Sequence, residues 1–226
     1  TDIDGDVRAG SPDSGADEFT GVGVPLAGTY TIGGTAPNFT TISQAVDSMN
    51  IVGISASVIF DIRDDSYPEQ FQVMPITGSS LTNTVTFQSE NRDSSLVNIN
   101  FAATSSYPYV FRLRAADYVI IRDLTITATG TNNSIAISLV GNPKWDSIYS
   151  CQIVGNTSVS SVGSIHSDEA LFNNIVIQNN NITSGYFGII LDAADAIFAV
   201  GINVSGNVLS GQSEYGILLE DMDAAI

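Results

Sequence analysis

A repeat of about 28 residues constrains this chain more than any other feature. Four short segments, VIIRDLTI, SIYSCQIV, IVIQNNNI and INVSGNVL, share an apolar residue, two spacers, a ladder residue, a spacer and a second apolar residue. The ladder residues are Leu124, Cys151, Asn180 and Asn207, at successive intervals of 27, 29 and 27 residues. A second series keeps this step, because Gly188 in FGIIL and Gly216 in YGILL lie 28 residues apart.

Repeats of this length, with short strands separated by Gly, Asn and Ser, are typical of a solenoid in which no coil buries its apolar face alone. We therefore predict an all-β fold, a right-handed parallel β-helix with coils of about 27–29 residues. Stacked coils place equivalent side chains about 4.8 Å apart. Asn180 and Asn207 are thus expected to form an inward amide ladder. Cys151 falls in the same column and is expected to be a small buried hydrophobe rather than a nucleophile.

One segment, NFTTISQAVDSMN, has helical rather than strand periodicity. Its apolar residues on one face are Phe39, Ile42, Ala45, Val46 and Met49. Thr40 or Thr41 is placed to cap the start of this helix. We predict an N-terminal capping helix near residues 40–50.

The charge of the chain excludes some partners. It has 24 acidic and 7 basic residues, and its formal charge of -17 repels phosphate backbones and anionic lipid surfaces. We expect no nucleic-acid partner, and no direct membrane insertion, because no run of 18 apolar residues occurs. Lys144 is the only lysine and the arginines are scattered, so a basic cleft for sugar acids is poorly supplied.

The segment from Gly28 to Val73, which contains GTYTIGG, NFTTISQAV and VIFDIRDDSYPEQFQV, resembles the opening of the pectin methylesterase and pectate lyase superfamily of β-helices. The matching residues are Tyr30, Ile32, Phe39 to Val46, Val58, Phe60, Ile62, Tyr67, Glu69 and Val73. The resemblance implies a β-helix whose barrel is capped by the helix near residues 40–50.

Pectin methylesterase activity is not expected. The resemblance implies an oxyanion-stabilising Gln before the strand IAIS, where this chain has Ser134. It also implies an acid-bearing tetrapeptide after Gly155, where this chain has NTSV at Asn156 to Val159. Such an esterase needs a carboxylate nucleophile, a second carboxylic acid and oxyanion donors. The residues that would supply them are missing.

Two acidic residues recur at the same offset in successive coils. Asp192 follows Gly188 as Glu220 follows Gly216, so the two acids are expected on adjacent coils of one face. Such a pair is suited to hold a cation or to act as the acid pair of a hydrolase; solvated turn acids are the alternative. His166, the only histidine, is expected on a solvent-facing turn near Asp168 and Glu169 without a catalytic role.

Aromatic residues on the predicted exposed turns are candidates for stacking on sugars, with turn packing as the alternative. The residues we select as a ligand-binding set are Tyr186, Phe187 and Tyr215, and Tyr107 and Tyr109 are further candidates.

The first residues, TDIDGDVRAGSPDSGADEF, resemble a closing motif of bacterial parallel β-helix domains. Residues 1–20 are then the end of a preceding β-helix domain or an acidic linker, and residues 26–226 a β-helix domain whose C-terminal end is truncated. The same acids also suit a calcium site, with Asp2, Asp4, Asp6 and Asp17 as oxygen ligands. The two interpretations are compatible, and the expected cofactor is calcium or none.

The sequence favours a non-enzymatic extracellular β-helix module that acts as a rod-like spacer or adhesin in a long surface protein and binds carbohydrate. The implied partners are surface or extracellular polysaccharide and neighbouring β-helix modules of the same polypeptide. The pattern resembles large secreted or cell-surface proteins of Bacteroidetes bacteria. The alternative is a calcium-assisted polysaccharide lyase or glycoside hydrolase on the same fold, with Asp192 and Glu220 as its acids.

Overall fold

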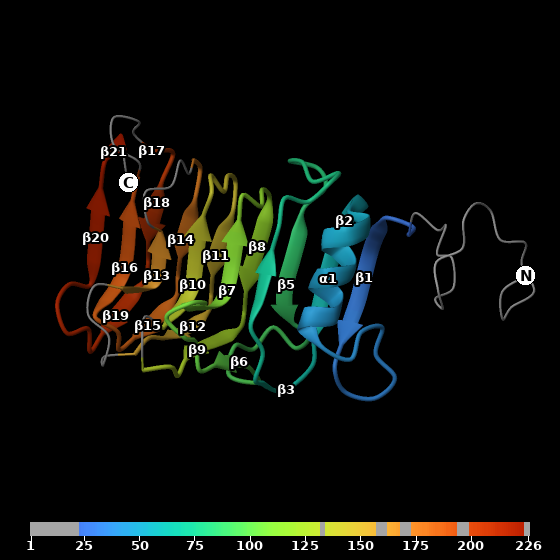
Figure 1. Cartoon of the computed structure of the whole chain (residues 1–226), viewed down its shortest axis with the longest axis horizontal. Helices are drawn as coiled ribbons and strands as arrows, with labels where there is room; N and C mark the ends of the chain where they lie inside the picture. The colour runs from blue at the N-terminus through green and yellow to red at the C-terminus, as the bar shows by residue number, and fades with distance from the viewer. Residues whose placement is uncertain (1–22, 132–133, 157–161, 168–172, 194–198, 224–226) are drawn as a thin grey trace, which may run out of the picture.

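The computed structural model describes residues 23–131, 134–156, 162–167, 173–193 and 199–223. These residues form one stack of coils that runs along the long axis of the molecule, from the blue strand β1 to the red strand β20 (Figure 1). The predicted calcium ligands Asp2, Asp4, Asp6 and Asp17 lie outside the described residues. The division into residues 1–20 and 26–226 stays a prediction.

Three parallel sheets run along the stack. Sheet 1 contains β1 (Leu26–Ile32), β2 (Ile54–Ile62), β5 (Val85–Ser89), β8 (Val119–Arg122), β11 (Ser147–Tyr149), β14 (Val176–Gln178) and β18 (Asn203–Ser205). Sheet 2 contains β3 (Asp65–Tyr67), β6 (Val97–Phe101), β9 (Thr125–Ala128), β12 (Gln152–Val154), β15 (Asn181–Thr183) and β19 (Val208–Ser210). Sheet 3 contains β4 (Phe71–Val73), β7 (Tyr109–Arg114), β10 (Ile135–Val140), β13 (Gly163–Ser167), β16 (Phe187–Asp192) and β20 (Ile217–Glu220). A separate pair joins β17 (Ala199–Val200) to β21 (Met222–Asp223).

Each coil visits sheets 1, 2 and 3 in turn, as in the strands β8, β9 and β10. The pairing reproduces the sequence repeat, because Ile148 pairs with Ile121 on one side and with Ile177 on the other. The predicted all-β parallel β-helix is therefore confirmed.

The core is a set of apolar columns that run through the coils. In the first coils it is filled by phenylalanine: the rings of Phe60 and Phe87 lie 5.0 Å apart between centroids, and those of Phe71 and Phe111 lie 4.5 Å apart. Isoleucine replaces phenylalanine further along, as at the fully buried Ile148 and its partners. Since the inward side of every strand is apolar, polar side chains with a function must project from the outer faces or the turns.

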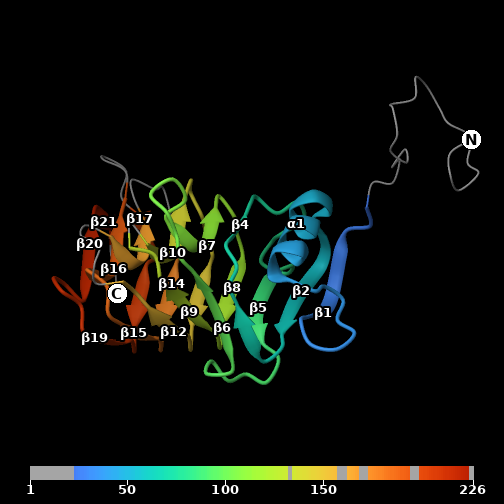
Figure 2. The ribbon, with the colours of Figure 1, turned by 60° about the horizontal axis from the view of Figure 1, so that its bottom comes forward.

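The single helix of the described residues, α1 (Ile42–Val52), covers the N-terminal end of this core beside β2 and β4 (Figure 2). Its buried residues are Ile42, Ala45, Val46 and Met49, as the periodicity predicts. Of the two threonines considered, Thr41 is the N-cap, and its Oγ1 accepts a hydrogen bond from the Gln44 amide at 3.1 Å. No helix in the described ranges has the length and apolar character needed to cross a membrane.

The predicted amide ladder is present at the turn between sheets 1 and 2. The Asn207 Oδ1 accepts hydrogen bonds from the Asn180 backbone amide and Nδ2, both at 3.0 Å. The Asn180 Oδ1 accepts one from the Cys151 amide at 2.9 Å. Burial raises the pKa of the Cys151 thiol to about 12, so this residue is an inert part of the column.

A second polar residue lies in the core without having been expected there. Asp146 is fully buried, and its Oδ1 accepts a hydrogen bond from the Val119 amide at 2.7 Å. Its Oδ2 has no hydrogen-bond partner within the described part of the chain. Burial, and secondarily the negative charge of Asp117, raise the pKa of Asp146 well above its usual range. The protonated acid is therefore the form that the folded protein prefers.

The Asp146→Asn variant tests this burial. Because the folded-state pKa is raised, the stability contributed by Asp146 is full below the unfolded carboxyl pKa and is lost as pH rises toward the folded-state value. Asparagine keeps the shape and the acceptor oxygen but cannot ionise. We expect its free energy of unfolding to match the parent near pH 4 and to exceed it increasingly toward neutral pH, measured by urea denaturation. An equal difference at both pH values would contradict a protonated Asp146.

Candidate ligand-binding face

The outer face of sheet 3 carries a column of polar side chains. The register pairs one outward residue of each strand with that of the next. From β4 to β20 these residues are Gln72, Arg112, Ser138, His166, Ile190 and Leu218. The polar part of the column thus lies toward the N-terminal coils, and the apolar part toward β16 and β20.

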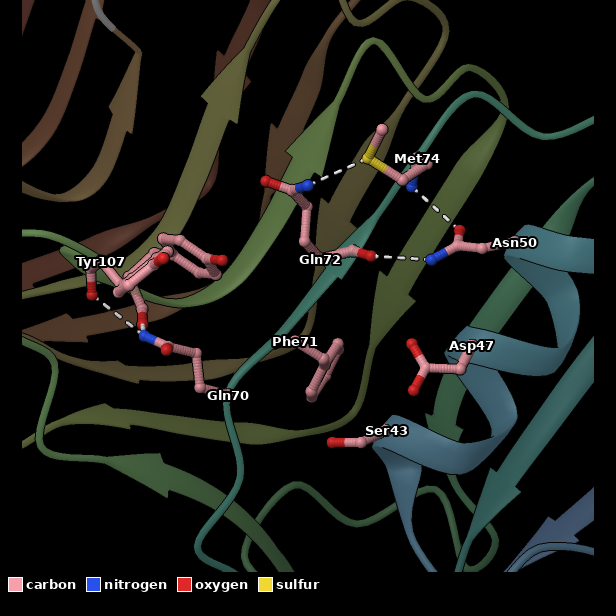
Figure 3. Close-up of a pocket in the computed structure, with 9 residues that line it drawn as sticks. Ser43, Asp47, Asn50, Gln70, Phe71, Gln72, Met74 and Tyr107 are labelled. Carbon is pink, nitrogen blue, oxygen red and sulfur yellow. Dashed lines mark hydrogen bonds between the residues drawn. The ribbon is translucent and has the colours of Figure 1, made fainter. Parts of the chain in front are cut away.

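A pocket of about 450 Å³ adjoins the N-terminal end of this column, between α1 and strands β4 and β7 (Figure 3). It is lined by Ser43, Asp47, Asn50, Gln70, Phe71, Gln72, Met74, Tyr107 and Tyr109. The three helix residues among them are spaced by four and three positions, so they share one helix face beside the buried stripe. The lining combines amide, hydroxyl and carboxylate groups with two tyrosines.

Hydrogen bonds from Asn50 hold one wall of the pocket in place. Its Nδ2 donates to the Gln72 carbonyl oxygen, and its Oδ1 accepts from the Met74 amide, both at 3.0 Å (Figure 3). β4 is the edge strand of sheet 3, so this side chain satisfies backbone groups that have no neighbouring strand. The helix is thereby fixed to the sheet at the pocket.

The opposite wall is built around the tyrosines. The Gln70 Nε2 donates to the carbonyl oxygens of Tyr107 and Tyr109. The Tyr107 side chain is 60% exposed, whereas Tyr109 is buried beneath the guanidinium of Arg112, which lies 3.7 Å from its ring centroid. The Arg112 Nε also donates to the Ser138 Oγ at 3.3 Å. Burial lowers the pKa of Arg112, which stays charged and forms no ion pair with another described residue.

The start of α1 depends on Glu69, a residue of the family-like opening. Its carboxylate accepts hydrogen bonds from the Ile42 amide at 3.2 Å, the Ser43 amide at 2.8 Å and the Ser43 hydroxyl at 2.7 Å. These are donors that a helix leaves unpaired in its first turn, and the negative charge also suits the helix dipole. Glu69 therefore holds the pocket-bearing helix from outside the helix.

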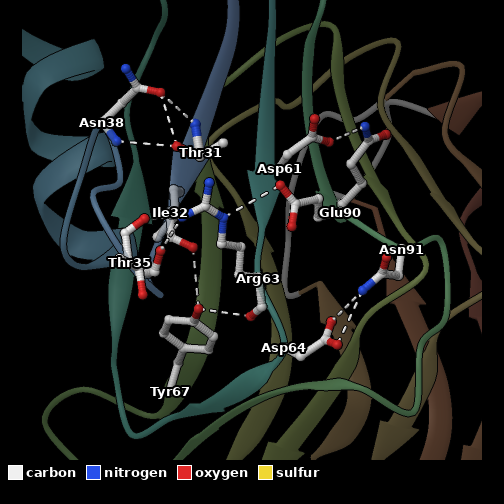
Figure 4. Close-up of polar contacts among 12 residues, drawn as sticks. Thr31, Ile32, Thr35, Asn38, Asp61, Arg63, Asp64, Tyr67, Glu90 and Asn91 are labelled. Carbon is white, nitrogen blue, oxygen red and sulfur yellow. Dashed lines mark hydrogen bonds and ion pairs between the residues drawn. The ribbon is translucent and has the colours of Figure 1, made fainter.

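Tyr67, the partner of Glu69 in that opening, is structural as well. Its hydroxyl donates toward the carbonyl oxygens of Arg63 at 2.8 Å and Ile32 at 3.3 Å (Figure 4). Burial raises the pKa of Tyr67 to about 12, so the phenol remains a donor. Arg63 continues the network by donating from Nη1 to the Thr35 carbonyl oxygen at 2.6 Å.

The acids expected in a hydrolase lie at the opposite end of sheet 3. Asp192 and Glu220 are register partners on β16 and β20, and the Glu220 side chain is exposed. The main chain of Asp192 is tied to Ser167, whose Oγ accepts from its amide at 3.0 Å. Within the described ranges, no group of three or more His, Cys, Asp or Glu residues is arranged to hold a metal ion.

The remaining residues selected from the sequence have mixed placements. The rings of Tyr186 and Phe187 lie 4.8 Å apart, and Phe187 and Tyr215 are stacked at 5.9 Å, so these three form one cluster. His166 lies in the outer column and its Nδ1 accepts from the Gly163 amide at 3.0 Å. Ser134 is buried, and its Oγ accepts from the Gly130 amide at 3.2 Å.

The pocket itself was not expected from the sequence. The helix near residues 40–50 is treated there as a cap only, and Gln70 and Gln72 are not considered. A usable signal exists in the spacing of Ser43, Asp47 and Asn50, which forms a polar stripe beside the apolar one.

Comparisons with known proteins bear on the fold. No family model and no curated protein matches the chain. Among solved structures, a pectin methylesterase mutant in complex with hexasaccharide IV is 11% identical, with a TM-score of 0.50, over 80% of this chain and 66% of that one. The pectin methylesterase from Aspergillus niger in its deglycosylated form is 11% identical, with a TM-score of 0.44, over 90% of this chain and 91% of that one. The first likeness confirms the predicted resemblance at the level of the β-helix fold.

Replacing Glu69 by alanine tests how α1 is held. The change leaves three donors at the helix start without their acceptor, and we expect a loss of about 2 kcal/mol in the free energy of unfolding. Urea denaturation measures it, and Glu214→Ala, at an exposed position, is the matched control. A loss no larger than that of the control would contradict the capping role of Glu69.

Proposed function

We propose that this chain is a non-enzymatic, extracellular β-helix module that binds carbohydrate and serves as a spacer or adhesin in a surface protein. The observation that carries the proposal is the pocket between α1 and sheet 3, where amide groups and two tyrosines line an open volume. Its size of about 450 Å³ falls in the range of small-ligand sites.

The chemistry of the pocket suits a sugar. Pyranose rings present hydroxyl groups that need donors and acceptors, and apolar C–H faces that pack on aromatic rings. Gln72 and Asp47 supply the first kind of contact, and the exposed Tyr107 supplies the second. Arg112 adds donors at the point where the pocket meets the outer column. Larger ligands have room to extend along that column, since sheet 3 is open beyond β7 in the direction of β16 (Figure 1).

The residues around the pocket support binding without catalysis. Among the nine described lining residues, Asp47 is the only carboxylate, whereas glycoside hydrolysis uses two. Ser134 occupies the place where the resemblance implies a glutamine, and its hydroxyl is buried and bonded to the backbone. The similar structure that holds a hexasaccharide adds support, because its β-helix accommodates a sugar chain.

The stacked coils support the spacer role. Each coil is joined to the next by three parallel strand pairings, as between the coils of β8 to β10 and β11 to β13. Such a stack advances by about 4.8 Å per coil and resists bending, because bending would break all three ladders. We place the module outside the cell, with polysaccharide as its partner.

The Tyr107→Ala variant tests the pocket. The protein is run by affinity electrophoresis through gels that contain β-1,4-glucan, xylan, β-1,3-glucan, mannan or pectin. We expect retardation by at least one of them, and about 5- to 10-fold weaker retardation for the variant, because an exposed ring that stacks on sugar is lost.

Tyr215→Ala is the matched comparison, since Tyr215 is a 53% exposed tyrosine of the other aromatic cluster. Weakening by Tyr215→Ala alone would move the site to the Tyr186, Phe187 and Tyr215 cluster. Absence of retardation by every polysaccharide would contradict carbohydrate binding.

The alternative function, a calcium-assisted lyase or hydrolase, is favoured only by the pairing of Asp192 with Glu220. We expect no shortened chains when the parent protein is incubated with the same polysaccharides, with added calcium or with a chelator, and analysed for new ends. Products that form with the parent and vanish in the Asp192→Ala, Glu220→Ala double variant would establish the alternative.

A further inference from the structure

A column of turn residues precedes sheet 1 on successive coils. Its backbone neighbours are linked by bridges along the series Asp117, Lys144, Asn173 and Val200. The residues that follow them have positive φ angles, and they are Tyr118 (64°), Trp145 (61°), Asn174 (55°) and Gly201 (69°). The same left-handed conformation thus recurs at the same place in four coils.

Two of these four residues are poorly suited to that conformation. Glycine and asparagine adopt positive φ readily, as at Gly201 and Asn174, whereas a bulky aromatic residue there is a backbone outlier. Burial does not compensate at Trp145, whose side chain is 48% exposed. Strained residues that the core does not require are concentrated at functional sites. The aromatic rings of Tyr118 and Trp145 therefore call for a role on the surface.

The two rings form an ordered pair. Their planes are inclined by only 1°, and their centroids lie 6.3 Å apart. Beyond Trp145 the column continues with the smaller residues Asn174 and Gly201, so the aromatic surface is confined to two neighbouring coils. It belongs to a turn before sheet 1, whereas the pocket adjoins sheet 3.

Acidic groups surround this pair. Asp146 directly follows Trp145 and is fully buried, and Asp117 directly precedes Tyr118. The Asp117 Oδ1 accepts a hydrogen bond from the Lys144 amide at 2.9 Å. The chain as a whole has a formal charge of -17, which repels anionic ligands and anionic lipid surfaces. An uncharged ligand with an apolar face fits these conditions.

We propose that Tyr118 and Trp145 form a second binding site, at which the pyranose rings of a neutral polysaccharide stack. Parallel aromatic rings offer the flat apolar surface that the C–H face of a pyranose covers. The site shares the ligand class of the proposed function but uses different residues on a different part of the coil, so the two proposals are tested separately.

The chain supplies its own probe for this site, because Trp145 is its only tryptophan. Cellohexaose, xylohexaose, laminarihexaose and mannohexaose are titrated into the whole chain while indole emission and acrylamide quenching are followed. We expect at least one of them to cause a saturable change of emission and about twofold protection from quenching. The affinity should be unchanged in about 0.5 M NaCl, since no charge pairing is involved.

Trp145→Asn is the decisive variant, because asparagine occupies the next place in the same column at Asn174. We expect thermal stability equal to or above that of the parent, together with about 5-fold weaker binding of the hexasaccharide by calorimetry. Tyr118→Asn keeps the tryptophan, so the same loss should be visible in its emission titration. Leu81→Asn, at a 77% exposed apolar position, is the control and should bind as the parent does.

Three outcomes would overturn the inference. One is unchanged emission with all four sugars while Tyr107→Ala weakens binding, which leaves the proposed function standing. Another is a Trp145→Asn variant that binds as tightly as the parent. The third is an emission change caused by phosphatidylcholine vesicles and by none of the sugars, which would assign the pair to a lipid surface. Failure of the whole chain to bind any sugar would remove both proposals.

Discussion

In-register stacking of successive coils is the constraint on which the rest of this structure depends. Each strand pairs in parallel with the equivalent strand of the next coil, as Ile153 does with Ile126 and Ile182. A shift of one residue in any coil would turn its core side chains outward. The register therefore determines at once which residues fill the core, which form polar ladders and which are lined up on the surface.

The same constraint explains the unusual features. The amide ladder of Asn180 and Asn207 is stable because each side chain meets its counterpart one coil away. The buried Asp146 is tolerated because its oxygen reaches the amide of Val119 on the neighbouring coil. Strain at Trp145 is maintained because its flanking residue Lys144 is bridged on both sides. In each case a local cost is offset by contacts that the stacking provides.

Much of the fold could be predicted from the sequence because the repeat is visible there. The spacing of Leu124, Cys151, Asn180 and Asn207 predicts the coil length, and the apolar stripe that ends at Met49 predicts the helix. The pairing of Asp192 with Glu220 also follows from equal offsets after two glycines. These features depend on one period along the chain.

The binding pocket could not be predicted in this way, because it depends on how α1 lies against β4. The contact of Asn50 with Gln72 joins segments outside the repeat, and no spacing announces it. The conformation of Tyr118 and Trp145 was also hidden, since residue preferences argue against positive φ at aromatic residues. The burial of Asp146 was missed for a similar reason, because an acid in an acidic chain is expected to be solvated.

The central claim is that this β-helix holds carbohydrate without transforming it. The most direct measurement is mass spectrometry of an oligosaccharide that the protein retains, recovered after prolonged incubation with protein in molar excess. Our account predicts that the oligosaccharide is recovered with its original mass and in the amount bound. A shorter chain, a new unsaturated end or a lost substituent would contradict it and would show that the fold carries an enzyme.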